Sequence, residues 1–308
     1  MKKLIFVCLA VALLLVVSCN QGNEPIYVKP RKGVGGGTVG SGVDPGKTAS
    51  TCYPAFQDLE LNVATWNIAW FPKNGATTWN KVQAMIPTLD ADVIAVQEIN
   101  SSSQFMALGQ ALQGWGTAYV DVRLDQETGF IYKESAFLQF GTPYAVSELS
   151  ASSPFPREAI RVDATHASGL EVTFINIHLK CCGSTGGSEY NRRKDASERL
   201  EAYIEQNLTN QAVIVLGDWN DEIKTGEESP FDNFKNDPAN YRFADQAVAD
   251  GSSSNWSYPS WPSHIDHILI TDELFDYLGN VQTVKPESCV SGYYNDVSDH
   301  RPVLASFK

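Results

Sequence analysis

Short apolar segments and amphipathic segments alternate along most of this chain, and this pattern constrains its fold more than any other feature. The apolar segments have the length of buried strands and fall at residues 61–66, 92–97, 117–122, 130–133, 159–163, 170–177, 212–216, 264–270 and 302–307. The amphipathic segments predict helices at residues 78–86, 102–113 and 189–208. No internal repeat divides the pattern, so residues 51–308 are predicted to form one α/β domain with a large sheet system.

Polar side chains that can carry out chemistry lie at the ends of these apolar segments. They are Asn67, Glu98, His178, Asp218, Asn220, Asp266, Asp299 and His300. Rigid strand ends can aim such groups at a common rim. One polar residue in this position is usually a cap or a turn former, but the repeated placement at strand ends predicts a functional site.

These residue types suit the hydrolysis of a phosphate ester. Carboxylate oxygens, such as those of Glu98, are the ligands that Mg²⁺ and Mn²⁺ prefer, and such a metal polarises phosphoryl oxygens. His178 and His300 could move protons or donate hydrogen bonds to developing negative charge. The sequence leaves open which histidine is the base and which is the acid.

The charge of the chain limits how it can bind a polyanion. Lys and Arg number 23 against 36 Asp and Glu, which gives a formal net charge of −13. This excludes a protein held on nucleic acid mainly by a basic surface. A polyanionic substrate would need a local site or a metal.

Six blocks of sequence, taken in order, resemble the signature of the endonuclease/exonuclease/phosphatase superfamily. They are TWNI (65–68), QE (97–98), NIHL (176–179), GDWND (217–221), HIDHIL (264–269) and SDHRP (298–302). The resemblance covers residues 61–308, and its specificity lies in the order and spacing of the blocks. It implies a four-layer α/β sandwich, in which two mixed sheets pack face to face with helices outside.

The resemblance also implies roles for individual residues. Asp218 and Asn220 would orient the attacking water or the phosphate. Asp266 would fix the tautomer of the His300 imidazole and stabilise its cation. The residues that would lie at the metal are Asn67, Glu98 and Asp299.

Two further blocks are similar to the deoxyribonuclease I branch of that superfamily. Tyr132 and Glu134 belong to a YKE segment, in which the glutamate would support His178. Arg157 stands where that branch has an arginine that reaches the phosphate. Both blocks are short, so they carry less weight than the six ordered ones.

Some polar residues are predicted to be structural. His264 and His267 lie on either side of Asp266 and are interpreted as structural imidazoles rather than catalytic groups. Arg193 is predicted to lie on a helix face and to pair with Glu189 four residues earlier.

The N-terminus predicts export and lipid attachment. A basic start is followed by an apolar run at residues 4–17, which is too short to span a membrane comfortably, so residues 1–18 are interpreted as a signal peptide. The run ends at Cys19 in a sequence that resembles the lipobox of bacterial lipoproteins. Residues 19–50 would form the lipid anchor and a Gly-rich tether. We therefore expect a protein anchored to the bacterial cell envelope, at the periplasmic or the outer surface of the outer membrane.

The remaining cysteines are Cys52, Cys181, Cys182 and Cys289. In an exported protein they favour one or two disulfides, and the sequence does not choose among the pairings. A zinc site is the competing interpretation, but the chain has no CxxC pair to support it. Cys181 and Cys182 are expected to shape the loop after His178.

The leading functional prediction is a metal-dependent phosphodiesterase, acting as an extracytoplasmic nuclease on DNA or RNA with Mg²⁺ or Mn²⁺. The alternative enzyme is a sphingomyelinase-like or inositol phosphate phosphoesterase, because the same core site serves lipid and sugar phosphates. A surface binding lipoprotein that kept the fold and lost turnover is the third hypothesis. We expect a monomer.

Overall fold

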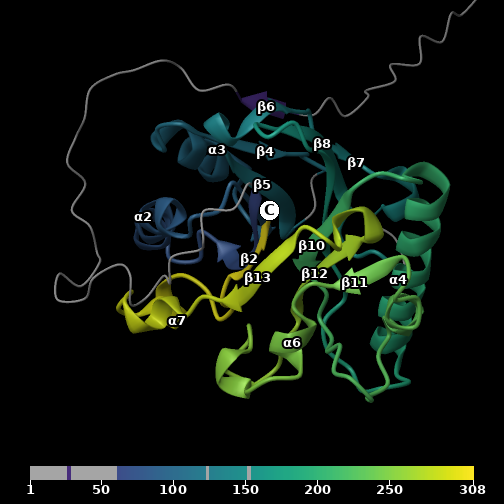
Figure 1. Cartoon of the computed structure of the whole chain (residues 1–308). Coiled ribbons are helices and arrows are strands. Elements are labelled where there is room, and N and C mark those ends of the chain that lie inside the picture. The colour runs from purple at the N-terminus through teal and green to yellow at the C-terminus, as the bar shows by residue number, and fades with distance from the viewer. Residues whose placement is uncertain (1–25, 29–60, 123–124, 151–153) are drawn as a thin grey trace, which may run out of the picture.

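The computed structural model describes residues 26–28, 61–122, 125–150 and 154–308, and it contains two seven-stranded mixed sheets (Figure 1). Sheet 1 has the strand order β1 (Ile26–Val28), β4 (Trp115–Tyr119), β5 (Glu127–Lys133), β3 (Val93–Ile99), β2 (Leu61–Phe71), β14 (Val303–Phe307) and β13 (Leu278–Thr283). Sheet 2 has the order β11 (Tyr241–Phe243), β12 (Asp266–Thr271), β10 (Val213–Asp218), β9 (Glu171–His178), β8 (Ile160–His166) and β6 (Phe137–Phe140), with β7 (Tyr144–Ala145) paired to β8.

The longer helices lie outside the two sheets, as Figure 1 shows. Those on sheet 1 are α2 (Ala76–Met85) and α3 (Ser102–Ala111), and the one on sheet 2 is α4 (Ser188–Asn207). The shorter helices are α5 (Asp232–Lys235), α6 (Gln246–Ala249) and α7 (Tyr293–Asp296). Single 3₁₀ turns occur at η1 (Ile86–Thr88), η2 (Glu134–Ala136), η3 (Ser147–Leu149), η4 (Ser253–Asn255), η5 (Asp272–Leu274) and η6 (Pro286–Ser288).

Three apolar clusters hold these layers together. Side chains alternate across a strand, so Val63 of β2 points into the cluster between the sheets, while its neighbours Ala64 and Trp66 belong to the cluster under α2 and α3. A third cluster packs α4 against sheet 2. The predicted four-layer α/β sandwich is therefore confirmed.

A buried polar contact fixes the two sheets relative to each other. Gln97 of β3 donates from Nε2 to Oδ1 of Asn176 on β9 at 2.8 Å. Asn176 in turn donates to the carbonyls of Val96, at 3.0 Å, and Gly129, at 2.8 Å. Both amides are fully buried, so losing either would leave polar groups without partners. Gln97 directly precedes Glu98, and Asn176 lies two residues before His178.

The observed elements differ from the predicted ones in several places. The predicted tether contains β1, which pairs with β4 at the edge of sheet 1. Thr78 does not cap α2; it lies inside the helix, and its hydroxyl donates to the Asp296 carbonyl. Strands β6, β7, β11 and β13 had no counterpart in the prediction.

Other N-terminal predictions lie outside the described residues. These are the signal peptide, Cys19, Cys52 and most of the tether. Among the residues that the structure does describe, no helix is both long and apolar enough to cross a membrane.

Candidate active site

Sheet 2 places three of the predicted residues in one row. His178 is the last residue of β9 and lies beside Asp218, the last residue of the parallel strand β10. Asp218 is also paired with Asp266, the first residue of the antiparallel strand β12. Because the register aligns these three positions, residues that are far apart in the sequence meet at one edge of the sheet.

Sheet 1 supplies the opposite side of the site. Asn67 on β2 is paired with Gln97 on the parallel strand β3, which brings Glu98 next to it. His300 precedes β14, which runs antiparallel to β2. Ser298 connects the two segments, because its hydroxyl donates to the Asn67 carbonyl at 2.6 Å and accepts from the His300 backbone N–H at 3.0 Å.

The two sides meet at Asp218. Its Oδ2 accepts from Asn67 Nδ2 at 3.0 Å and lies 3.4 Å from His178 Nε2 and 3.9 Å from His300 Nε2. Asn67 Nδ2 also donates to Glu98 Oε1 at 3.1 Å. The structure thus brings the residues from both sheets together around one buried carboxylate.

Asn67 connects the two carboxylates. Its Oδ1 accepts from the Ala69 backbone N–H at 2.9 Å, and its Nδ2 faces Glu98 and Asp218. In this arrangement Asn67 positions the two carboxylates. Its role as a metal ligand stays a prediction.

Left-handed backbone conformations concentrate at this rim. Glu98 has φ 65°, Trp70 has φ 52° and Asn220 has φ 59°. Such values are costly for residues with a side chain and persist where surrounding contacts impose them. Here Trp70 N–H donates to Glu98 Oε2 at 2.9 Å, and Asn220 N–H donates to Asp218 Oδ1 at 3.0 Å.

Burial and charge set opposite protonation states for the two histidines. Burial lowers the pKa of His178 well below its ordinary value, and the charges of Arg157 and His300 act in the same direction. Burial would also lower the pKa of His300, but the Asp266 carboxylate, 2.8 Å from His300 Nδ1, outweighs it and raises that pKa to about 10. At neutral pH His178 is neutral and His300 is a cation.

The carboxylates fit a divalent cation. Glu98 Oε1 and Asp218 Oδ2 both accept from Asn67 Nδ2, so these two carboxylates face each other, and Asp299 lines the same cleft. Burial, followed by the charge of Asp266, raises the pKa of Asp218 to about 7, and Glu98 adds to that effect. A bound cation would relieve this repulsion, and the oxygen-rich donor set suits a hard metal such as Mg²⁺ or Mn²⁺.

A cleft of about 1010 Å³ opens over these groups. The predicted residues that line it are Glu98, Arg157, His178, Asp218, Asn220, Asp299 and His300. Asp266 lies beneath, fully buried, and its Oδ1 has no hydrogen-bond partner among the described residues. The lining also includes residues that were not predicted, among them Trp70, Gln126, Lys180, Tyr258 and Trp261. The ring of Tyr258 lies 4.9 Å from that of His300.

The comparison with protein families agrees with this geometry. The model of the Endonuclease/Exonuclease/phosphatase family matches residues 64–300, which include five of the six sequence blocks in full and the first three residues of the sixth, SDHRP (298–302). The chain belongs to this family.

Several solved structures share the fold of this chain. Humanised zebrafish (D. rerio) TDP2 has a TM-score of 0.64 at 13% identity, covering 80% of this chain and 98% of its own. The 3′-5′ exonuclease NExo of Neisseria meningitidis has a TM-score of 0.61 at 17% identity, covering 80% and 100%. A mannosyl-6-phosphatase of Bacteroides thetaiotaomicron has a TM-score of 0.59 at 17% identity, covering 80% and 99%. No curated protein sequence matches the chain.

Two residues predicted from the deoxyribonuclease I branch of the family lie away from the cleft. Tyr132 is paired with Val93 at the start of β3, whereas Glu98 is near its end, and the Tyr132 ring stacks on Phe140 in the core between the sheets. Glu134 follows at the same distant end of β5. The expected support of His178 by Glu134 is therefore wrong, and His178 Nδ1 has no hydrogen-bond partner among the described residues.

The structural interpretation of His264 and His267 agrees with their contacts. His267 Nδ1 lies 2.6 Å from Asp245 Oδ2, and its Nε2 lies 2.9 Å from the Asp221 carbonyl. Because both ring nitrogens face acceptors, His267 carries both protons and forms a buried ion pair with Asp245. His264 Nε2 lies 2.9 Å from the same carboxylate oxygen. The ring nitrogens of His264 and His267 that face Asp245 are paired with its carboxylate, so these three residues form a hydrogen-bonded network.

Arg193 is buried rather than surface-paired as predicted. It is only 2% exposed, and its Nε and Nη2 donate to Asp221 Oδ2 at 3.0 and 2.7 Å. Its Nη1 donates to the carbonyls of Lys180 and Cys182. Arg193 therefore ties the loop after His178 to the segment after Asn220.

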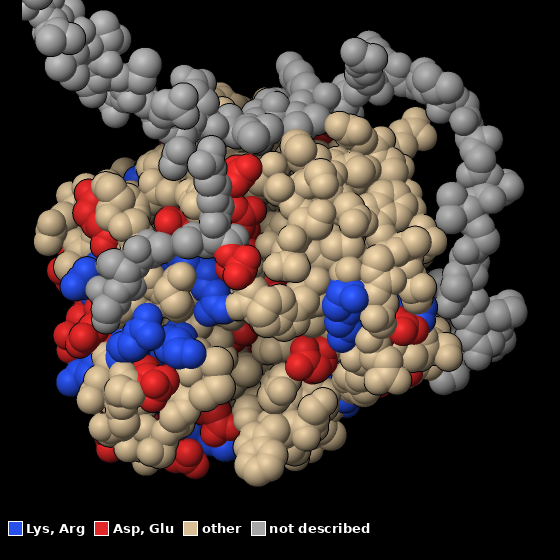
Figure 2. Space-filling model, turned by 180° about the vertical axis from the view of Figure 1, so that it is seen from behind, with Lys and Arg blue, Asp and Glu red and all other residues tan. Residues whose placement is uncertain are grey.

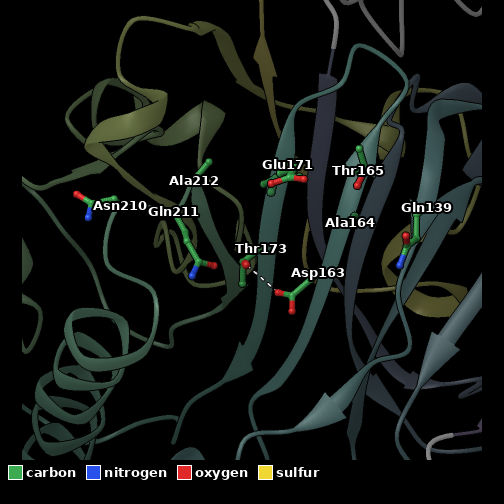
Figure 3. Close-up of a pocket in the computed structure, with 10 residues that line it drawn as sticks. Gln139, Asp163, Ala164, Thr165, Glu171, Thr173, Asn210, Gln211 and Ala212 are labelled. Carbon is green, nitrogen blue, oxygen red and sulfur yellow. Dashed lines mark hydrogen bonds between the residues drawn. The ribbon is translucent and has the colours of Figure 1, made fainter.

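A second hollow, of about 450 Å³, lies on sheet 2 away from the site (Figure 3). Its lining includes Glu171 and Ala212, which stand at the beginnings of β9 and β10, whereas His178 and Asp218 end those strands. Asp163 there accepts from the Thr173 hydroxyl at 2.7 Å. It contains none of the predicted site residues.

Proposed function

We propose that this protein is a divalent-metal-dependent phosphodiesterase that acts as a nuclease outside the cytoplasm. Membership of the family supports hydrolysis of phosphoester bonds. The observation that carries the proposal is the meeting of Glu98, His178 and His300 around Asp218, from both sheets, at the floor of one cleft.

The residues divide the work of hydrolysis between them. Asp218, with a pKa of about 7, accepts a proton from the attacking water, and Asn220 beside it orients that water. The His300 cation donates to the negative charge that develops on the phosphoryl group or the leaving oxygen. Arg157 lines the same cleft and binds a phosphate oxygen.

Neutral His178 donates a hydrogen bond to a phosphoryl oxygen from its protonated ring nitrogen, without adding a second cation beside His300. Glu98, with Asp299 as a further carboxylate, would hold Mg²⁺ or Mn²⁺. When bound, the metal polarises the phosphoryl oxygens and offsets the charge of the carboxylates.

Aromatic side chains at the cleft favour a nucleic acid as the substrate. Trp70 is 52% exposed and Trp261 is 78% exposed, and both line the cleft. Large exposed indoles are suited to stacking on unpaired bases, which contributes about 1–3 kcal/mol per base. Structures with this fold include a Neisseria NExo variant bound to a product DNA hairpin and zebrafish TDP2 with a single-stranded DNA product.

Figure 2 shows Lys and Arg side chains in small groups among Asp and Glu on one face, without a continuous basic surface. This distribution agrees with recognition at the cleft rather than along a broad basic face.

The test is a substrate panel with and without EDTA. Purified protein with Mg²⁺ is expected to nick plasmid DNA and cleave single-stranded oligonucleotides, and EDTA or His178→Ala is expected to abolish both. Trp261→Ala should raise KM for the oligonucleotide about tenfold. Tyr277→Ala is the matched control, because Tyr277 is 49% exposed but outside the cleft lining. Intact DNA and RNA with every metal tried would rule out the nuclease assignment.

A sugar or lipid phosphate is the second candidate substrate. The same two tryptophans could stack on a sugar ring, and a mannosyl-6-phosphatase shares the fold. The panel therefore includes mannose 6-phosphate, inositol phosphates and sphingomyelin. Release of phosphate or phosphocholine from one of these, together with intact nucleic acid, would favour this alternative.

We also propose that Cys19 carries the lipid that anchors the protein to the bacterial envelope. The proposal is supported by the apolar run at residues 4–17 and the lipobox-like sequence that ends at Cys19. A tethered enzyme of this kind would act on substrates that reach the envelope from outside the cytoplasm.

A further inference from the structure

Two adjacent cysteines lie in the wall of the cleft, directly after the segment that carries His178. Cys181 and Cys182 are free thiols, and both line the cleft. Cys182 is exposed, and its thiol donates to Cys181 Sγ with the two sulfur atoms 2.8 Å apart. A disulfide bond is about 2.05 Å long, so the sulfurs need to approach by less than about 1 Å to be joined.

The surrounding contacts hold the two thiols in this position. Arg193 Nη1 donates to the carbonyls of Lys180, at 2.7 Å, and Cys182, at 2.8 Å. These two hydrogen bonds fix the backbone on both sides of Cys181. Cys182 has φ 74°, a left-handed conformation that is uncommon for a residue with a side chain. The pair is therefore presented by an imposed loop conformation rather than by a freely moving segment.

The two sulfurs have different roles in this arrangement. Lys180 Nζ lies 3.8 Å from Cys181 Sγ, and Cys182 also donates to Cys181. The hydrogen bond to Cys181, followed by burial, raises the pKa of the Cys182 thiol. Cys181, which accepts from both neighbours, is the sulfur placed to attack, and Cys182 is placed to complete the exchange.

We propose that Cys181 and Cys182 form a reversible modification site, which exchanges with disulfide compounds and closes to a disulfide in the cleft wall. The Cys181 thiolate attacks one sulfur of the incoming disulfide and expels the first thiolate, which gives a mixed disulfide. The Cys182 thiolate then attacks Cys181 Sγ and expels the second thiolate. Two electrons pass from the protein to the incoming disulfide, and the two protons leave with the released thiols.

Backbone geometry makes this disulfide reversible. Neighbouring Cα atoms across a trans peptide are about 3.8 Å apart, below the lower limit of about 4.4 Å that is usual for disulfides. A bond between adjacent cysteines is therefore strained, and strained disulfides are readily reduced. Cys289, by contrast, is disulfide-bonded and buried among apolar residues under sheet 1.

The loop contacts connect this chemistry to the site. Asn220 Nδ2 donates to the Leu179 carbonyl at 3.1 Å, and Arg193 binds both the Cys182 carbonyl and Asp221. Forming the disulfide changes the conformation of the peptide between Cys181 and Cys182. The contacts of Leu179 and Arg193 then carry this change to the segment that contains Asn220. The effect on catalysis rests on the proposed function, whereas the thiol chemistry does not.

The test counts thiols on the intact protein. The full chain is equilibrated in glutathione buffers from fully reduced to fully oxidised, quenched with acid, labelled with a maleimide and weighed by mass spectrometry. As the buffer becomes more oxidising, the number of maleimide labels at positions 181 and 182 of the wild type is expected to fall from two to none. No glutathione should be bound at either position. Cys181→Ser and Cys182→Ser, which each keep one of these thiols, should instead gain one glutathione as a mixed disulfide.

The proposal is overturned if the wild type keeps both labels at every ratio, or if it collects glutathione adducts as the single variants do. The link to the cleft is tested by measuring KM for the cleaved substrate in the same buffers. KM should differ between the reduced and oxidised wild type and stay constant in a variant with both cysteines changed to Ser. A KM that does not change in the wild type would overturn that link, while the mass measurement decides the thiol chemistry even for an inactive enzyme.

Discussion

At the residue scale, the central arrangement is one carboxylate that faces one neutral histidine and one histidine cation. Asp218 Oδ2 lies 3.4 Å from His178 Nε2 and 3.9 Å from His300 Nε2. Burial holds the pKa of His178 low, whereas Asp266 overcomes burial at His300. The sequence motifs predicted both histidines, but not their protonation states, because these depend on burial and on neighbours from another strand.

The Asp266–His300 pair gives a prediction about pH. In Asp266→Asn, His300 loses the largest contribution that raises its pKa to about 10, so that pKa falls, because only the charges of Asp218 and Asp299 then oppose the effect of burial. A step that needs the His300 cation should lose its activity at a lower pH than in the wild type, and kcat at neutral pH should fall by about 10²–10⁴. A pH–rate profile of both proteins measures this. An unshifted alkaline limb in the variant would contradict the role of His300.

At the element scale, the site depends on strand register. The alternation of apolar and polar residues predicted most strands of both sheets, since a buried strand has a simple pattern. It could not predict the direction of a strand within a sheet, so it did not show that the YKE segment, interpreted from its resemblance to the deoxyribonuclease I branch, lies at the end of β5 away from the cleft. Gln126, which precedes β5 at the correct end and lines the cleft, had no motif to mark it.

The buried pair between the loop after β11 and strand β12 gives a stability prediction. Asp245→Asn leaves the His267 cation without its partner and should lower the free energy of unfolding by about 3–5 kcal/mol. Burial opposes ionisation of both groups, but their mutual charge lowers the pKa of Asp245 and raises that of His267. In the unfolded chain, Asp has a pKa of about 3.9 and His a pKa of about 6.5. The pair therefore stabilises the fold fully between these two pH values.

Urea unfolding of both proteins across pH measures this difference, which should be largest between those two values. It should shrink as acid protonates Asp245 or as rising pH deprotonates His267. Glu198→Gln is the control, because the side chains of its ion pair with Lys194 are both more than half exposed and the pair should contribute at most about 1 kcal/mol. Equal effects of the two substitutions would contradict a buried ion pair.

At the scale of the whole molecule, an acidic chain carries a local site for an anionic substrate. The net charge of −13 predicted that an anionic substrate would need such a local site. The structure places the basic residues Arg157 and Lys180 in the cleft. The six ordered motifs predicted the family and the sandwich because each motif lies at or near one end of a strand that borders the cleft. The exposed tryptophans of the cleft escaped prediction, since neither Trp70, near the end of β2, nor Trp261, in a turn, belongs to a periodic pattern.

The proposed anchor gives a prediction about location. In Cys19→Ser, the thiol that would carry the lipid is lost, so the protein should move from the membrane fraction to the soluble fraction of the bacterial envelope. Fractionation followed by immunoblotting measures this, with Cys182→Ser as the control that should stay with the membrane. A Cys19→Ser protein that remains in the membrane fraction would contradict lipid attachment at this residue.

The most direct test of the whole account is the Mg²⁺ dependence of hydrolysis of bis(p-nitrophenyl) phosphate by the wild type and Glu98→Gln. The substitution keeps the size of the side chain and removes the carboxylate that faces the metal position. The wild type should lose activity in EDTA and regain it with Mg²⁺, while Glu98→Gln should need far more Mg²⁺ and remain about a hundredfold slower. Equal Mg²⁺ curves for the two proteins, or full activity in EDTA, would contradict a divalent cation held at Glu98.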